Sequence, residues 1–377
     1  MGLVLGAGLT LIQAANVSSP NASWSCAYAA ERLPRALRLI GEDAFSAEET
    51  RTARKRLALS DAVLTRASAL ALARSVGATR LVLIRCLDQK NKTTIEAQTF
   101  DTSGPVAGSV FRIEETLAAL PKAVDQIARD LGPPGAVLAD GAFPAPSGRA
   151  LAKAGPALAR VSAVERAAGI RQALSEDPGS IDLRLSAVEA LIAARDYAAA
   201  IEVADAEQGG RAHPPPLFRL LRFLAAAARL EAGRYAEARD LLEQLRVEQE
   251  TAAVLNNLGV ARFRLRDPEA SGAFERALFF GDHRKNDISF NRSLALIFEN
   301  KSEIALPSLD AALAADPEDV RTRLLKVWAL RLLRRDDERA AEWERLVTRA
   351  PSFSPLAMPD LGRRLERIFF FERSPGA

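Results

Sequence analysis

The sequence predicts a mainly α-helical protein in which a solenoid of about five helix pairs follows a small α/β (α+β) domain. The chain has 377 residues, more than a single domain usually contains. Patterns typical of strands occur only before residue 132, whereas residues 160–351 show helical periodicity in short segments. We therefore expect a domain at 1–132, a linker rich in glycine, proline and alanine at 133–159, repeats at 160–351, and a capping helix with a tail at 352–377.

The elements of the first domain follow from local patterns. The apolar stretch 1–15 fits either a buried first strand or the core of a signal peptide, although no lysine or arginine precedes it. Further strands are expected at 79–87, 93–101 and 108–114, and helices at 24–40, 47–57, 64–78 and 116–131. Thr65 is a candidate N-cap of the helix at 64–78, and Gly77 is its candidate stop.

The charge distribution argues against nucleic acid as a partner. The net charge is only +3, and 48% of the residues are apolar. Lysine and arginine number 16 up to residue 140 against 14 acidic residues, and 35 against 34 after it. Neither part carries the concentrated basic surface that binds a phosphate backbone.

Few residues are available for metal or catalytic chemistry. Cys26 and Cys86 form no CxxC motif, and the only histidines are His213 and His283. With so few cysteines and histidines we expect no metal site and no Ser-His-Asp triad. We also expect no cofactor, because the glycines at 6–8 lack the third glycine of a dinucleotide loop. Two buried free thiols are the favoured interpretation of the cysteines, and a disulfide requires a fold that brings them together.

Alanines recur at a regular interval in the second part of the chain. Aligned on the first turn of each second helix, they are Ala200, Ala238, Ala270 and Ala305, at intervals of 38, 32 and 35 residues. An alanine or a larger apolar residue follows each marker after four positions, namely Ala204, Leu242, Phe274 and Leu309. The stretch 256–278 is the most complete copy, because Gly259 and Ala277 accompany its marker and its phenylalanine.

This spacing resembles the tetratricopeptide repeat, a helix–turn–helix unit of 34 residues. The resemblance implies five units, at 181–209, 216–246, 251–281, 286–317 and 318–351, with a partial unit at 157–178 before them. Arg339 stands at the alanine place of the last unit, and the third unit is one residue short before its second helix. Units of this kind stack into a superhelix, and the resemblance implies that their first helices line a concave groove.

The first domain resembles a different family. A polar loop at 16–24 follows the first apolar run, and a helix, a Gly-Ala turn and a core strand follow at 64–87. This arrangement resembles the amino-terminal α/β domain of TolB and is similar to CsgG- and FlgO-related domains, which occur in bacterial envelope proteins. The resemblance covers about residues 8–132 and implies a periplasmic or envelope location, with the cytoplasm as the alternative, and no catalytic residues.

The groove supplies the candidate partner-binding residues. Counted from Gly259 in each unit, they are Asn256, Asn257, Arg264, Phe290, Asn291, Arg321 and Arg331. Asparagine amides can hydrogen-bond an extended backbone, and arginines can bind carboxylates, so a peptide of acidic character is one hypothesis. The alternative is that the asparagines bond neighbouring helices and the arginines are solvated.

The main functional hypothesis is a non-catalytic scaffold that binds a peptide or protein partner in this groove, in an envelope or outer-membrane assembly. A second is a structural homo-oligomer that self-associates through the repeat or tail surfaces. A third is an enzyme in the first domain, whose most notable carboxylates are Asp88, Glu96, Asp101, Glu114 and Glu115. These carboxylates accompany no histidine or nucleophile motif, so we expect no enzyme.

The carboxyl terminus is the last predicted element. Leu361, Leu365, Ile368 and Phe369 fall on one face of a helix, which predicts a helix that caps the last repeat. The aromatic run 369–371 is otherwise an exposed apolar patch that offers a second partner site.

Overall fold

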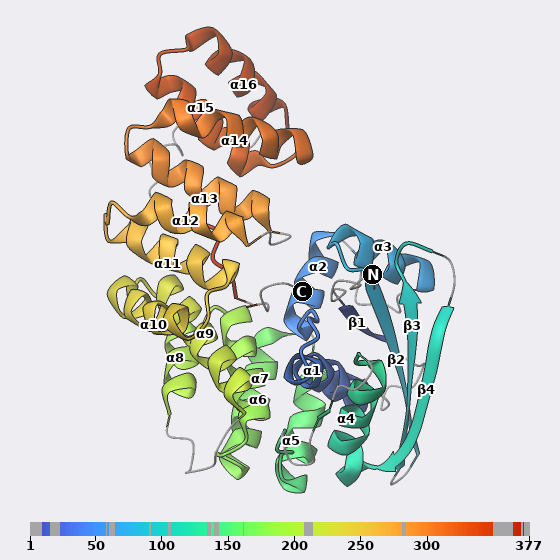
Figure 1. The fold of residues 1–377 in the computed structure, drawn as a ribbon. Coiled ribbons are helices and arrows are strands. Elements are labelled where there is room, and N and C mark those ends of the chain that lie inside the picture. Colours follow the sequence, from blue (N-terminus) through green and yellow to red (C-terminus); the bar gives the residue numbers. More distant parts are fainter. Residues whose placement is uncertain are drawn as a thin grey trace, which may run out of the picture. The chain divides into compact units, whose positions relative to one another are not determined.

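The computed structural model describes residues 10–15, 23–57, 59, 65–89, 92–104, 107–133, 137–138, 143–160, 162–206, 214–280, 284–349, 365–370 and 372. Within these ranges the chain forms sixteen α-helices, a short 3-10 helix (η1, Leu117–Ala119) and four β-strands (Figure 1). It divides into two compact units, Met1–Ala228 with Gly376–Ala377 and Arg229–Pro375. The predicted fold class, mainly helical with a small α/β part, is confirmed.

A four-stranded sheet forms the α/β part of the first unit. Its strands are β1 (Thr10–Ala15), β2 (Arg80–Gln89), β3 (Lys92–Asp101) and β4 (Ala107–Thr116), in the order β1-β2-β3-β4. β1 pairs with β2 in parallel, and the other two pairs are antiparallel. The aliphatic β2 is central and largely buried because helices cover both of its faces, whereas β4 lies at an edge and is mostly exposed. The apolar stretch near the amino terminus therefore ends in a strand.

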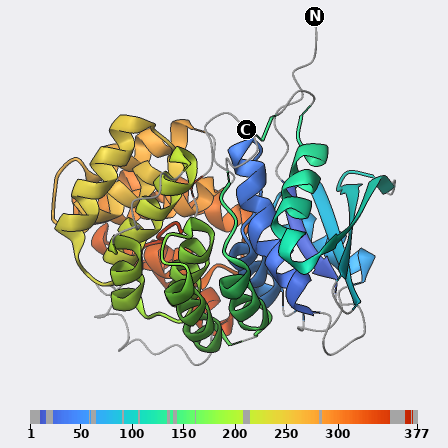
Figure 2. The same ribbon diagram turned by 90° about the horizontal axis from the view of Figure 1, so that it is seen from below.

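Helices cover the two faces of the sheet. They are α1 (Ser23–Leu39), α2 (Ala47–Arg56), α3 (Arg66–Ser75) and α4 (Leu120–Leu131). α1 and α4 pack together on one face (Figure 2), while α2 and α3 share a core with Leu81 and Leu83 on the other. The Thr65 hydroxyl accepts a hydrogen bond from the Ser68 amide at 3.2 Å, and Gly77 has φ +72°, so the predicted cap and stop of α3 are confirmed.

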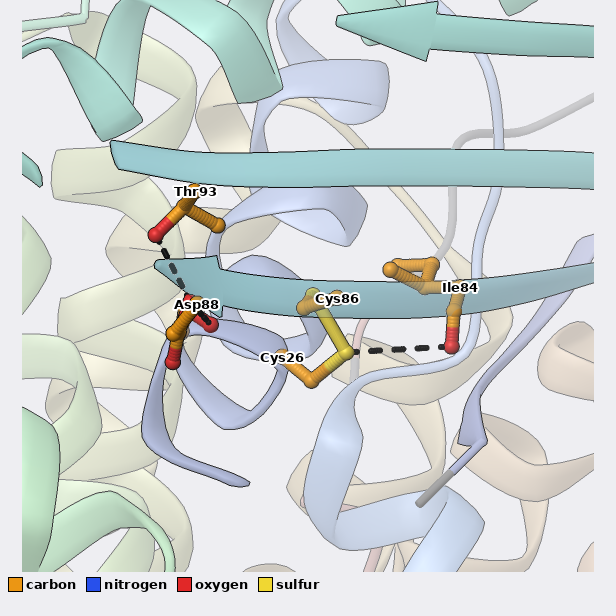
Figure 3. Close-up of a disulfide and its surroundings, with 6 residues drawn as sticks. Cys26, Ile84, Cys86, Asp88 and Thr93 are labelled. Carbon is orange, nitrogen blue, oxygen red and sulfur yellow. Dashed lines mark hydrogen bonds between the residues drawn. A yellow bond between two sulfur atoms is a disulfide. The ribbon is translucent and has the colours of Figure 1, made fainter. Parts of the chain in front are cut away.

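The two cysteines form a disulfide that ties α1 to β2 (Figure 3). Cys26 and Cys86 are 60 residues apart in sequence, with their Cα atoms 5.5 Å apart. Cys86 points to the α1 face because side chains alternate along β2 and Leu81 and Leu83 face the opposite way. The interpretation as free thiols is therefore wrong, since it judged each cysteine without its partner.

Five helices follow in the first unit, and the first of them lies inside the predicted linker. They are α5 (Gly148–Leu158), α6 (Ala163–Glu176), α7 (Ile181–Ala193), α8 (Tyr197–Asp205) and α9 (Pro215–Glu231), the last of which extends into the second unit. Ser147 caps α5 by accepting a hydrogen bond from the Ala150 amide at 3.3 Å. Residues 148–158 thus form a helix that pairs with α6 instead of a linker, because Ala150 and Ala154 are buried against it.

Buried ion pairs connect the α/β part to these helices. Arg32 and Arg35 of α1 bind Asp182 of α7, with nitrogen–oxygen distances of 3.0 and 2.7 Å. Arg32 also binds Asp125 at 2.8 Å, and Arg35 binds Glu189 at 2.7 Å. We call these five residues the ion network; they unite sequence segments that the domain prediction separates.

Burial and charge act against each other in the ion network. Burial alone would raise the pKa of Asp182, but the Arg32 and Arg35 guanidiniums outweigh it and hold the pKa below its ordinary value. At Glu189 burial prevails and raises the pKa to about 7 in spite of Arg35. Both arginines stay charged, because their carboxylate partners offset the cost of burial.

The described residues of the second unit form seven complete helices and the end of α9. The seven are α10 (Tyr235–Glu248), α11 (Ala252–Arg264), α12 (Ala270–Phe279), α13 (Lys285–Phe298), α14 (Ser302–Ala315), α15 (Val320–Leu332) and α16 (Asp336–Arg349). Successive helices pack against one another from α10 to α16. The five predicted helix pairs, from α7–α8 to α15–α16, are all present among the described residues.

One backbone motif repeats at the turn within each pair. Left-handed residues stand there at positions 195, 233, 266, 300 and 334, with φ between 57° and 78°. Their spacings are 38, 33, 34 and 34 residues. In each turn the next amide bonds the carbonyl five residues back, as Asp267 does to Arg262 at 2.9 Å. The backbone therefore reproduces the period that the alanine markers predict.

The pair α11–α12 shows why the marker residues are needed. A Cβ atom added at Gly259 would lie 2.6 Å from the Phe274 ring, so only glycine permits this close approach. Phe274, Ala270 and Ala277 are all buried at this contact. Ala270 stands four residues after the left-handed Arg266, whereas Ala305 stands five after Asn300, which is the predicted one-residue shortening.

Candidate peptide-binding groove

The inner helices α11, α13 and α15 of the second unit hold a segment of the chain itself. Residues 365–370 and 372, here called the tail, run from α15 past α13 to the start of α11 (Figure 1, red). Residues 365–370 are not helical, so the capping helix is wrong over this range; residues 352–364 lie outside the described part. The tail is extended because groove side chains, in place of helical neighbours, bond its backbone.

Two asparagines bind the tail backbone in the same way. Asn291 of α13 accepts a hydrogen bond from the Arg367 amide at 2.8 Å and donates one to the Arg367 carbonyl at 2.9 Å. Asn257 of α11 does the same with Phe369, at 2.8 and 2.6 Å. The asparagines are 34 residues apart, one repeat, and the tail residues are two apart, one period of an extended chain. The repeat and the extended backbone are thus in register.

A third asparagine joins these two into one ladder. Asn256 donates to the Arg367 carbonyl at 2.9 Å and to the Asn257 side-chain oxygen at 3.2 Å. Its own side-chain oxygen accepts a hydrogen bond from the side-chain nitrogen of Asn291 at 2.9 Å. All three asparagines are fully or almost fully buried, so each amide needs such partners to offset the loss of water.

The Arg367 side chain occupies a site of opposite charge. Its guanidinium pairs with Asp287 at the start of α13 and with Asp319, the N-cap of α15. It also lies 4.4 Å from the centre of the Phe290 ring. Burial alone would lower the pKa of Arg367, but the two aspartates raise it above its ordinary value. The site therefore recognises a planar cation between two carboxylates and an aromatic face.

Four tail side chains besides that of Arg367 contact the groove. Glu366 binds Arg264 of α11, with its oxygen 2.5 Å from Nε. Phe369 is buried, and the Arg284 guanidinium stands 3.8 Å from the centre of its ring. Leu365 packs against the buried cluster of Leu324 and Leu346, and Glu372 accepts a hydrogen bond from the Thr251 hydroxyl at 3.0 Å. Phe369 and Glu372 are thus almost inaccessible to water, and the predicted exposed aromatic patch does not hold for Phe369.

Most of the predicted groove residues meet at the tail. Asn256, Asn257, Arg264, Phe290 and Asn291 all contact it. Arg321 and Arg331 have exposed side chains, and neither forms a hydrogen bond or an ion pair with the described tail residues. Binding of a partner by these seven residues remains a prediction.

Sequence reasoning missed the acidic side of the groove. Asp287, Asp319 and Thr322 contact Arg367, but none belongs to the repeat pattern from which the groove was predicted. The available signal was local: both aspartates stand at the amino end of an inner helix, where carboxylates are common for capping. Because capping alone explains an aspartate at this place, the sequence did not indicate that the two aspartates lie at the groove.

The carboxylates considered for catalysis are dispersed over β2, β3 and β4. Asp88 accepts a hydrogen bond from Thr93 (Figure 3) and another from Ser25, both at 2.7 Å. Asp101 accepts from Ser103, which lowers the pKa of this carboxyl. Glu114 pairs with Lys92 at 3.0 Å on the exposed surface. These contacts stabilise strands and turns and do not converge on a common point.

Two more properties hold for the described part of the chain. No helix there is both long enough and apolar enough to cross a bilayer. No group of three or more histidine, cysteine, aspartate or glutamate side chains there is arranged to hold a metal ion. His213 and His283 lie outside the described residues.

Comparison with known proteins gives distant structural likenesses. No protein-family model matches the chain, and no curated protein matches it. Among solved structures, it is similar to a chain of the APC/C hetero-tetramer Cut9-Hcn1, with a TM-score of 0.46 and 16% identity over 58% of this chain and 43% of that one. It is also similar to YrrB, described as a TPR protein with an unusual peptide-binding site, with a TM-score of 0.37 and 16% identity over 49% of this chain and 94% of that one. A structure of MamA gives a TM-score of 0.38 and 14% identity over 48% and 98%. The chain thus spans less than half of the Cut9-Hcn1 chain that it matches.

Proposed function

We propose that this protein is a non-catalytic interaction scaffold that binds an extended segment of a partner protein in the groove of α11, α13 and α15. One observation carries the proposal: Asn257 and Asn291 each bond both the amide and the carbonyl of one residue in an extended chain. These bonds read the backbone and not a particular side chain, so another peptide can make them in the same register.

The groove is also suited to a peptide by its rigidity. Asn257 and Asn291 project from inner helices that pack directly on each other, so their one-repeat spacing is fixed before a ligand binds. A preformed row of donors and acceptors lowers the ordering cost of binding, which then falls on the peptide alone. Arg264, Asp287 and Asp319 add charges of both signs, so we propose a peptide that carries both charges in place of one of acidic character.

The test is a selection from a random peptide display library. The full-length bait carries Arg367→Glu, which places a negative charge between Asp287 and Asp319 and displaces the tail. We expect enriched peptides that lose binding when Asn257→Ala and Asn291→Ala are added. The matched control is Asn286→Ala, an exposed asparagine of α13. Enrichment that is indifferent to both groove asparagines would contradict the proposal.

We further propose that the protein works in the bacterial cell envelope. The Cys26–Cys86 disulfide supports this, because disulfides persist in oxidising compartments and are rare in the cytosol. The resemblance of residues 8–132 to envelope domains agrees with it. Alkylation of thiols in intact source cells, followed by mass spectrometry, should find both cysteines unlabelled until a reductant is added. Labelling without reductant would argue for the cytoplasm.

A further inference from the structure

The tail fills the groove with specific chemistry at several positions. Side chains of opposite charge meet Glu366 and Arg367, and a buried site receives Phe369. Glu366 binds Arg264, so a negative residue is matched there. Ile368 is only partly buried and lies between the two residues whose backbone is bonded, so its position is the least specified. The pattern that the groove fits is acidic residue, arginine, any residue, phenylalanine.

Arginine is favoured over lysine at position 367 for a geometric reason. Asp287 and Asp319 take different nitrogens of one guanidinium, while its flat face lies on the Phe290 ring. A lysine ammonium is a compact point charge that cannot match two carboxylates and a ring in this planar manner. The groove therefore discriminates between the two cations.

We propose that the partner segment has this same chemistry, and that the tail is an internal competitor that occupies the site until the partner displaces it. This inference rests on the proposed function and specifies its ligand. The competitor and the partner need the same asparagine ladder, and each amide of Asn257 and Asn291 is already used by the tail. Only one of the two can therefore be bound at a time.

The covalent connection makes the competition effective. Fifteen residues separate Arg349, the end of α16, from Leu365. A tethered segment that can reach its site has an effective concentration of about 1 mM, so a free peptide of equal intrinsic affinity competes poorly. A partner succeeds when it binds more tightly, or when something draws the tail away.

The experiment measures binding of a labelled peptide with the sequence of residues 363–374 to full-length protein by fluorescence anisotropy. We expect weak binding to the wild type and at least about tenfold tighter binding to Arg367→Glu, whose own tail is repelled. Adding Asn257→Ala and Asn291→Ala should abolish the binding. A peptide with lysine in place of its arginine, and one with alanine in place of the phenylalanine at position 369, should each bind about tenfold more weakly.

Each outcome has a definite meaning. Equal peptide affinity for wild type and Arg367→Glu would overturn the competition. Failure of this peptide, together with display peptides of another pattern that still need Asn257 and Asn291, would overturn the motif and leave the proposed function intact. Failure of all peptides would contradict both. Circular dichroism checks that Arg367→Glu keeps its helices. Phe369→Ala is a second variant in which the tail should leave the groove.

Light scattering distinguishes an internal tail from an exchanged one. An internal competitor predicts a monomer whose mass does not change with concentration. A concentration-dependent mass in the wild type that Arg367→Glu abolishes would show that the tail binds a second copy, which overturns the intramolecular proposal.

Discussion

The ion network of the first unit and the groove of the second provide partners for buried polar side chains in different ways. Both bury polar side chains, and both satisfy almost all of them. In the ion network the partners come from α1, α4 and α7, which are fixed by the packing of the unit. In the groove the partner of the asparagines is a tail without helical structure. The ion network therefore joins helices that are fixed by packing, whereas the groove bonds a segment that we propose a partner can replace.

The largest expected effect breaks the ion network. Asp182→Ala leaves Arg32 and Arg35 buried without their shared carboxylate, which should lower the free energy of unfolding by about 3–5 kcal/mol. Urea unfolding followed by circular dichroism measures it. The control is Glu176→Ala, whose pair with Lys153 is on the surface and should contribute little. If both variants lost the same free energy of unfolding, the ion network would stabilise the fold no more than a surface ion pair does.

The second effect concerns the helix packing that supports the ladder. Gly259→Ala places a methyl group against the Phe274 ring, and the resulting overpacking should cost about 1–3 kcal/mol in unfolding free energy. Gly272→Ala in α12 is the matched control, because nothing lies within 4 Å of its added Cβ. That substitution should stabilise the protein by about 0.5–1 kcal/mol. Thermal unfolding of both should show shifts of opposite sign.

The third effect is local to the groove. Asn291→Ala removes the two bonds to the Arg367 backbone, so the tail should open more readily, by about 1–3 kcal/mol. Hydrogen exchange should show faster exchange at the amides of Arg367 and Phe369, with the protection of α7 unchanged. Lost protection throughout the chain would mean that the tail is a structural part of the core and not a replaceable ligand.

The last effect is a pH dependence within the ion network. The pKa of Glu189, raised to about 7 by burial, lies above the ordinary 4.5, so the folded state holds this proton more tightly than the unfolded chain. Its contribution to stability is fully present below pH 4.5 and is lost as the pH rises through about 7. Glu189→Gln cannot ionise, so it should lose less stability than wild type between about pH 5 and pH 8. If the urea midpoint changed with pH in the same way in the wild type and in Glu189→Gln, the assignment of the pH dependence to Glu189 would be wrong.

Much of the fold could be predicted because its signals are local. The cap at Thr65, the stop at Gly77 and the strands β2 to β4 follow from residue types within a few positions. The repeat was predictable because each unit restates the same packing, small residues at Gly259 and Ala270 against Phe274. The matching places of Asn257 and Asn291 follow from that period alone.

The sequence by itself thus determined the helix pairs, their period and the asparagines on the inner helices. Only the tertiary structure decided the Cys26–Cys86 pairing, the ion network and the path of the tail, since these join residues far apart in the chain. The tail shows the physical reason most clearly. Leu365 and Phe369 fit one face of a helix, but the alternation of Arg367 and Phe369 equally fits an extended chain. Hydrogen bonds from Asn257 and Asn291, more than 70 residues away, select the extended form.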